Sequence, residues 1–187
     1  MKDGENRFAA VFEQSPCTAV HPSDVAPVLL ALDAKVRTVH PGGETSLALA
    51  DLYRPPEEAR RTETVLDPGH LITSIEIPAS ADESKMTYLK AMDRKIWAFA
   101  LVGVAVVLRF AGTVVEDAHV VLSGVSNIPV RSGAAEETLR GRALDDRSIE
   151  DAAQAALATA APLRQNGYKL TLGVNLLRRA LENLKQD

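Results

Sequence analysis

The sequence predicts an α+β fold in two domains, and the order of its segments is the main reason. In the second half, three strand-like segments precede three helix-like segments, an order typical of an antiparallel sheet covered by a helical layer. Residues 79–85 are small and polar, and they separate two parts of the chain in which apolar residues are spaced differently. We therefore place the two domains at residues 1–79 and 84–187.

A short helix is expected near the start of the first domain. Ser23 is a favoured N-cap, Asp24 suits the positive end of a helix dipole, and residues 25–32 supply an apolar face. Pro27 is acceptable because the first turn of a helix leaves its backbone donors without partners anyway.

The remainder of the first domain reads as strands and turns. Residues 36–39 form a strand, 41–44 a turn, and 46–52 the returning strand or edge. Residues 54–64 are charged and rich in turn-forming residues, which indicates a loop on the surface (a surface excursion). Residues 69–78 alternate in polarity as a strand does, and Pro78 stops them.

The second domain supplies three longer strands and three helices. The predicted strands are residues 86–92, 98–110 and 114–125, the last two joined by a tight turn at 111–113. Apolar residues three and four apart predict helices at 133–140, 148–160 and 169–185. Ser148 followed by Asp151 resembles a capping box at the start of the second helix.

The composition narrows the function classes. A formal charge of −4 with interspersed signs gives no basic footprint for nucleic acid and no polybasic anchor for a membrane. The longest apolar run, residues 96–108, is about 13 residues, shorter than the ~20 that a membrane span requires. The polar N-terminus does not resemble a signal peptide, and one cysteine fits a reducing compartment. We expect a cytoplasmic location.

No catalytic constellation is visible in the sequence. The four histidines are scattered without ligand spacing, and the common hydrolase and nucleotide-binding motifs do not occur. The single glycine pair, Gly42-Gly43, lies between strands, so a hairpin turn is favoured over a phosphate cradle. A stand-alone enzyme of another class therefore ranks last among the hypotheses, and no catalytic residue is assigned.

Lys90 and Asp24 are the most informative polar residues, each with two interpretations. Lys90 lies in an apolar strand, where its ammonium either reaches solvent or needs a partner. Beside a flavin it would stabilise the negative charge of the reduced ring. Asp24 either caps the helix or accepts hydrogen bonds from a ligand. Arg94 and Lys95 extend the positive charge, and Trp97 is a core anchor or, less favoured, a lid over an aromatic ring.

Several segments resemble a known family in their order and spacing. They are residues 16–27, 71–78, 88–90, 122–125 and 166–169. Together they resemble the FAD-binding (medium) subunit of the molybdenum hydroxylase, or xanthine dehydrogenase, family, close to its 4-hydroxybenzoyl-CoA reductase and aerobic-type CO dehydrogenase branch. The resemblance implies a truncated PCMH-type FAD-binding subdomain followed by a CO dehydrogenase flavoprotein C-terminal-like domain, with a three-stranded antiparallel sheet and three helices.

The resemblance also implies a cofactor, partners and site residues. The cofactor would be FAD, with Asp24, Ile72 and Lys90 close to it, tuning and positioning the ring rather than acting as acids or bases. The partners would be a molybdenum-cofactor subunit and a two-iron-cluster subunit, with NAD as one acceptor. Electrons would pass from the iron–sulfur clusters through FAD to that acceptor.

Three departures from the family pattern limit this expectation. The N-terminal flavin subdomain with its glycine-rich pyrophosphate loop is not found in this sequence, and neither is the Gly-Gly-Asn stretch expected just before it begins. FAD binding is therefore expected to be weak or absent in this chain. Cys17 matches the last of four cluster ligands in one branch, which makes it an iron–sulfur ligand only in a longer parent. The alternative function is a non-catalytic assembly or binding module that has lost flavin binding.

Overall fold

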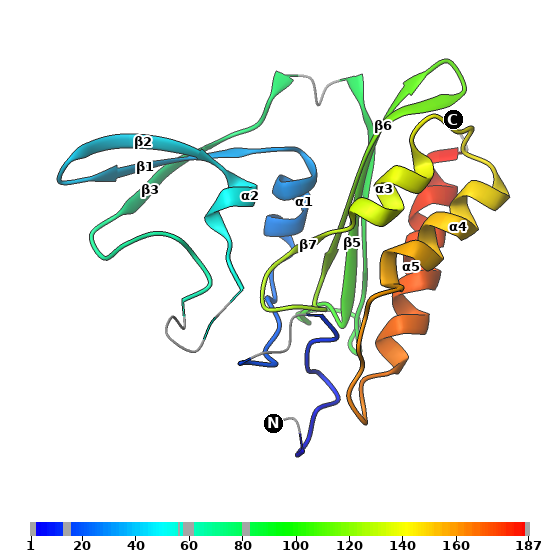
Figure 1. Ribbon diagram of the computed structural model, residues 1–187, viewed down its shortest axis with the longest axis horizontal. Helices are drawn as coiled ribbons and strands as arrows, with labels where there is room; N and C mark the ends of the chain where they lie inside the picture. Colours follow the sequence, from blue (N-terminus) through cyan, green and yellow to red (C-terminus); the bar gives the residue numbers. More distant parts are fainter. Residues whose placement is uncertain (1–2, 13–15, 56, 58–61, 80–82, 186–187) are drawn as a thin grey trace.

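The computed structural model describes residues 3–12, 16–55, 57, 62–79 and 83–185. Two antiparallel sheets carry the fold, and helices pack on both faces of the larger one (Figure 1). The elements of the first part are α1 (Val25–Ala31), β1 (Lys35–His40), β2 (Gly43–Ala48), α2 (Leu49–Leu52) and β3 (Leu71–Glu76). Those of the second part are β4 (Lys85–Ala91), β5 (Val102–Ala111), β6 (Val114–Ser123), β7 (Val130–Arg131), α3 (Gly133–Leu139), α4 (Asp146–Leu157) and α5 (Tyr168–Lys185).

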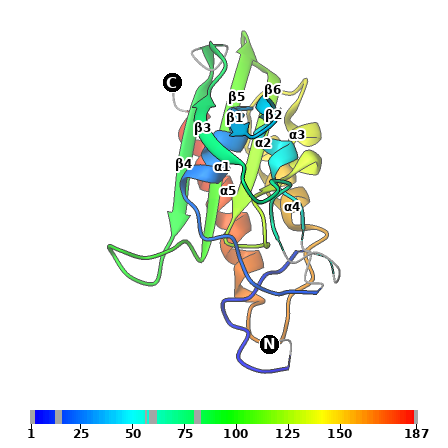
Figure 2. The same ribbon diagram turned by 90° about the vertical axis from the view of Figure 1, so that its left-hand side faces the viewer.

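The larger sheet has the strand order β4-β5-β6-β7 and forms the centre of the molecule. Alternate residues of β5 point to opposite faces: Val104 and Val106 pack under α4 and α5, whereas Ala105 and Val107 pack toward α1. Because both faces are covered, β5 is apolar almost throughout, which explains its unbroken hydrophobic run in the sequence. Figures 1 and 2 show α1 on the face opposite α4 and α5.

The smaller sheet has the order β2-β1-β3, and one of its edges is poorly covered. Every residue of β3 is exposed, including the large apolar side chains of Leu71, Ile72 and Ile75. An apolar strand at a sheet edge is normally covered or paired, because its backbone groups and side chains otherwise attract other chains. β3 therefore offers an apolar surface that further polypeptide could cover.

The N-terminal segment packs into the core of the second part, far from its neighbours in sequence. Val11 is fully buried in the cluster formed by β5, β6 and the three C-terminal helices. Its amide donates to the Val125 carbonyl, and its carbonyl accepts from the Ala161 amide. Asn6 and Gln165 exchange two further hydrogen bonds. Residues 6–12 thus contribute to the larger core, whereas the division at residues 79–85 stays a prediction.

The predicted antiparallel sheet under three helices is confirmed, with differences in detail. The sheet gains a fourth, two-residue strand, β7, which no sequence pattern indicated. The segment 46–52 is not one strand: β2 ends at Ala48 and a single helical turn, α2, follows. The second predicted strand of this domain, β5, begins at Val102 rather than residue 98, because residues 97–101 form a loop. The centres of the predicted linker and surface excursion, residues 80–82, 56 and 58–61, lie outside the described residues.

Two local expectations were wrong for identifiable reasons. The capping box of α4 uses Asp145 and Ser148, because Asp145 precedes the helix and accepts from the Ser148 amide at 2.8 Å. Asp151 instead pairs with Arg142. Trp97 is not a core anchor: 92% of its surface is exposed, and its backbone has a positive φ of 54°. Among the described helices, none combines the length and apolarity that crossing a membrane requires.

Candidate functional site

Asp24, Tyr88 and Lys90 form a compact polar cluster where the first part meets the larger sheet. Lys90 Nζ lies 2.6 Å from Asp24 Oδ2, and Tyr88 Oη donates to Asp24 Oδ1 at 2.7 Å. Tyr88 and Lys90 reach the same carboxylate because residues two apart on a strand share a face. Ser23 makes the capping bond of α1 by accepting from the Ala26 amide, which leaves the Asp24 carboxylate for the cluster.

The charges of the cluster follow from these contacts. Burial disfavours the charged form of Asp24, but the hydrogen bonds from Lys90 and Tyr88 outweigh it and hold the pKa of Asp24 below its ordinary value. Burial, together with the bond to Asp24, raises the pKa of Tyr88, so its phenol stays protonated and acts as a donor. The Lys90 side chain is only 23% exposed, so the predicted requirement for a partner is met by Asp24.

Gly103 on β5 leaves the space that Tyr88 occupies. A Cβ at this position would lie 2.9 Å from Tyr88 Oη and 2.3 Å from Ser123 Oγ. Any larger residue would therefore displace the phenol that holds Asp24. Tyr88 and Gly103 were missed by the sequence analysis, although the same-face spacing of Tyr88 and Lys90 was a usable signal for the tyrosine.

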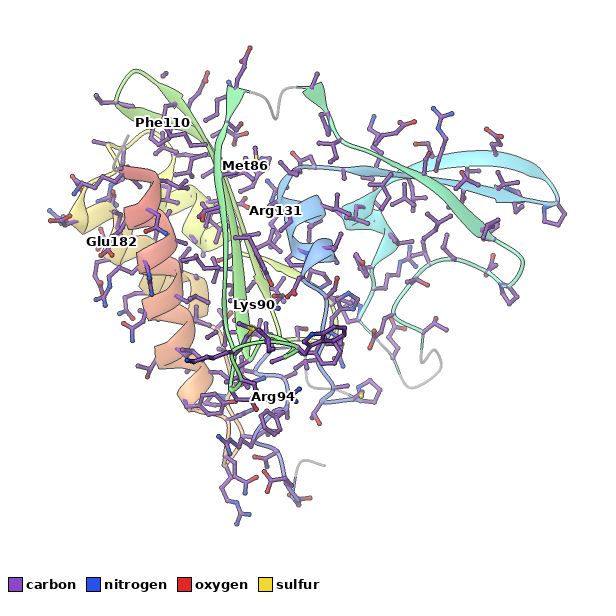
Figure 3. The ribbon with its side chains drawn as sticks, turned by 180° about the vertical axis from the view of Figure 1, so that it is seen from behind. Met86, Lys90, Arg94, Phe110, Arg131 and Glu182 are labelled. Carbon is purple, nitrogen blue, oxygen red and sulfur yellow. The ribbon has the colours of Figure 1, made fainter. Side chains whose placement is uncertain are left out.

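The loop after β4 is tied to the cluster and exposes three large apolar side chains. Lys90 Nζ also donates to the Ala98 carbonyl at 3.2 Å, and Arg94 donates to the Trp97 carbonyl at 2.7 Å. Ile96, Trp97 and Phe99 are each more than 70% exposed. Figure 3 shows Lys90 and Arg94 close together at this end of β4. A neighbouring cavity of about 330 Å³ is lined by Arg94 and Phe99 among others.

The other predicted residues lie elsewhere. Ile72 is on β3 in the smaller sheet, where it pairs with Thr38 and is 44% exposed. Its hydrocarbon side chain has no polar atom, and Ile72 takes no part in the hydrogen bonds described for Asp24 and Lys90. Cys17 is a free thiol that accepts from the Ala19 amide. Within the described ranges no group of three or more His, Cys, Asp or Glu residues could hold a metal ion.

The cluster combines groups of different chemistry on one side of β4. It offers a cationic donor, a carboxylate acceptor and a nearby exposed indole, which match ring carbonyls, ring N–H groups and an aromatic face. The Gly42-Gly43 pair turns β1 into β2, as predicted, and no helix follows that turn directly. This turn therefore does not have the geometry of a glycine-rich phosphate cradle, which needs a helix N-terminus.

Comparisons with known proteins identify both parts of the chain. The family model described as the CO dehydrogenase flavoprotein C-terminal domain matches residues 87–184. The model described as the FAD binding domain in molybdopterin dehydrogenase matches residues 15–80.

Individual relatives agree with the family models. The FAD-binding subunit of an Escherichia coli aldehyde oxidoreductase is 37% identical over 94% of this chain and 52% of its own length. The carbon monoxide dehydrogenase medium chain of Afipia carboxidovorans is 30% identical over 87% of this chain and 56% of its own length. The solved structure of reconstituted CO dehydrogenase from Oligotropha carboxidovorans superposes with a TM-score of 0.76 at 30% identity, covering 87% of this chain and 56% of that one.

The chain spans about half the length of these relatives, and the matches cover both its parts. The two family models match in the order that the sequence predicts, and the antiparallel sheets agree with the match to a solved CO dehydrogenase. The chain therefore belongs to the family of FAD-binding subunits of the molybdenum hydroxylases, whose cofactor is FAD.

Proposed function

We propose that this chain forms the ring side of the FAD site in a molybdenum hydroxylase of the xanthine dehydrogenase type. The observation that carries the proposal is the Asp24–Tyr88–Lys90 cluster, built from both family domains. The partners would be a molybdenum-cofactor subunit and a two-iron-cluster subunit, in the cytoplasm. When bound, FAD would accept electrons from the clusters and release them to an acceptor such as NAD.

Each residue of the cluster has a distinct part in this proposal. Lys90 would place its positive charge at the carbonyl edge of the ring, where reduction adds negative charge. Asp24 would orient the Lys90 ammonium and accept from ligand N–H or O–H groups. Trp97 is free of core packing and could cover the ring face, since its loop is tethered to Lys90 through Ala98. Ile72 would approach the ring through its backbone on β3.

The uncovered β3 supports the expectation that flavin binding by this chain is weak. The relatives are almost twice as long, and the exposed row Leu71, Ile72 and Ile75 is a surface that further polypeptide could cover. A ring site without phosphate contacts would hold FAD loosely, because charge-assisted bonds to phosphate are among the strongest contacts a dinucleotide makes. Cys17 remains a proposed iron–sulfur ligand in a longer parent only.

Equilibrium dialysis of the chain against FAD tests the proposal. We expect weak, saturable binding that Lys90→Met loosens about tenfold, which corresponds to roughly 1.4 kcal/mol. Lys95→Met, which removes an exposed charge from the same loop, is the matched control and should leave binding unchanged. If both variants weakened FAD binding equally, Lys90 would act only through its positive charge and not through a specific contact. No binding at any concentration would favour the alternative of a non-catalytic assembly module.

A further inference from the structure

The helix α1 is held to the larger sheet at both ends. At its start, Asp24 is bound by Tyr88 and Lys90 of β4. At its other end, His119 of β6 contacts the carbonyl of its last residue, Ala31, and Arg131 of β7 binds the carboxylate of Asp33 just beyond it. Figure 3 shows Lys90 toward one end of α1 and Arg131 toward the other.

The second contact is an ion network centred on Asp33. Arg131 Nη1 lies 2.7 Å from Asp33 Oδ1, and His119 Nε2 lies 3.4 Å from Asp33 Oδ2. The other nitrogen of the same imidazole, Nδ1, lies 2.6 Å from the Ala31 carbonyl oxygen. Arg131 is itself anchored by the buried carboxylate of Glu136, and His119 by Asp117. Both partners of Asp33 are thus themselves in contact with a further carboxylate of the same part of the fold.

Aspartate is an unfavourable choice at position 33 unless its charge is used. Its backbone φ is +51°, a left-handed conformation that glycine adopts more readily than aspartate does. It also follows the C-terminal end of α1, where a negative charge opposes the helix dipole. Glycine would be the ordinary residue at this place. The carboxylate therefore carries two local costs, and its contacts with His119 and Arg131 offset them.

We propose that Asp33 is a positioning residue: held by His119 and Arg131, it fixes α1 so that Asp24 stays on Lys90 and Tyr88. The consequence for flavin rests on the proposed function, whereas the positioning itself does not. Seven residues of helix separate the two contacts, so a shift or rotation of α1 at its end moves Asp24 at its start. Packing of α1 on β5 and β6 sets the distance between the helix and the sheet. The contacts of Asp24 and Asp33 set the position of the helix along the surface of the sheet.

The test is the titration of Asp24, followed through its carboxyl carbon by NMR without any flavin. Asp33→Gly removes the carboxylate and relieves the backbone strain, so we expect a thermal midpoint equal to or above that of the parent chain. In the same variant the pKa of Asp24 should rise toward its ordinary value, because Lys90 and Tyr88 no longer hold it as closely. Asp33→Asn, which keeps one acceptor oxygen, should give a smaller rise.

Asp51→Asn on α2 is the control, since it removes an exposed carboxylate from the same part of the fold. The proposal is overturned if the Asp33 variants move the Asp24 titration no more than this control does. Should Asp33→Gly fail to fold, Asp33→Asn decides by the same criterion. FAD dialysis on these variants is a separate measurement: if the chain proves not to bind FAD, the Asp24 titration still decides whether Asp33 positions α1.

Discussion

Val11→Asp is expected to unfold the larger core of this protein at neutral pH. Val11 has no exposed surface and lies in the cluster under α4 and α5, with both of its backbone groups bonded to the second part of the chain. An aspartate there would bury a charge without a partner, at a cost of several kcal/mol. Because domains are stable by only about 5–15 kcal/mol, this single change removes most of the margin.

Circular dichroism during urea unfolding measures this effect. The matched control is Phe8→Asp, which adds the same charge to the same segment at a half-exposed position. We expect the control to change the midpoint little. If Val11→Asp were as stable as Phe8→Asp, residues 6–12 would not belong to the larger core, and the description of the N-terminal segment would be wrong.

The second large effect concerns Lys169, a buried lysine without a carboxylate partner among the described residues. Its ammonium donates to the carbonyls of Phe8 and Gly124, and it thereby ties the N-terminal segment to the end of β6. Burial lowers the pKa of Lys169 to about 8. At a pH between this value and the ordinary lysine pKa, Lys169 is protonated in the unfolded chain and neutral in the folded chain. Folding stability should therefore rise as the pH rises through this window, and it should be lost again as the pH falls toward 8.

Comparison with Lys169→Met isolates this contribution. The free energy of unfolding of the parent chain, relative to the variant, should rise by roughly 3 kcal/mol between about pH 8 and pH 10.5, because each unit of pKa shift is worth about 1.4 kcal/mol. Other titrating groups are common to both proteins and cancel in the difference. Lys35→Met, at an exposed position on β1, should show no such trend. A constant difference across the window would contradict the burial of a charged Lys169.

Patterns with a regular period were readable from the sequence. The three C-terminal helices follow from their apolar spacing, and β5 and β6 from their long apolar runs. Lys90 was identifiable because a cation inside an apolar strand requires a partner, and the structure supplies Asp24. These features depend on residues close together in the chain, and for that reason local reasoning reached them.

The features that were missed depend on contacts between distant residues. Val11 carries no mark of its burial under helices more than 130 residues later, and the exchange of hydrogen bonds between Asn6 and Gln165 has no periodicity. Trp97 was expected in the core because large aromatic residues are usually buried, but it lies exposed in a loop whose backbone carbonyls are bound by Lys90 and Arg94. Asp33 was overlooked because a positive φ is visible only in the folded backbone.

The central claim is that Asp24, Tyr88 and Lys90 form the edge of a flavin-ring site, and NMR titration with FAD tests it most directly. Trp97 is the single tryptophan, so its indole N–H gives one signal to follow beside the amides of Asp24 and Lys90. We expect FAD to shift all three signals. ADP, which lacks the ring, should shift none of them, and Lys90→Met should weaken the response to FAD. Equal shifts with FAD and ADP, or shifts confined to other parts of the chain, would contradict the claim.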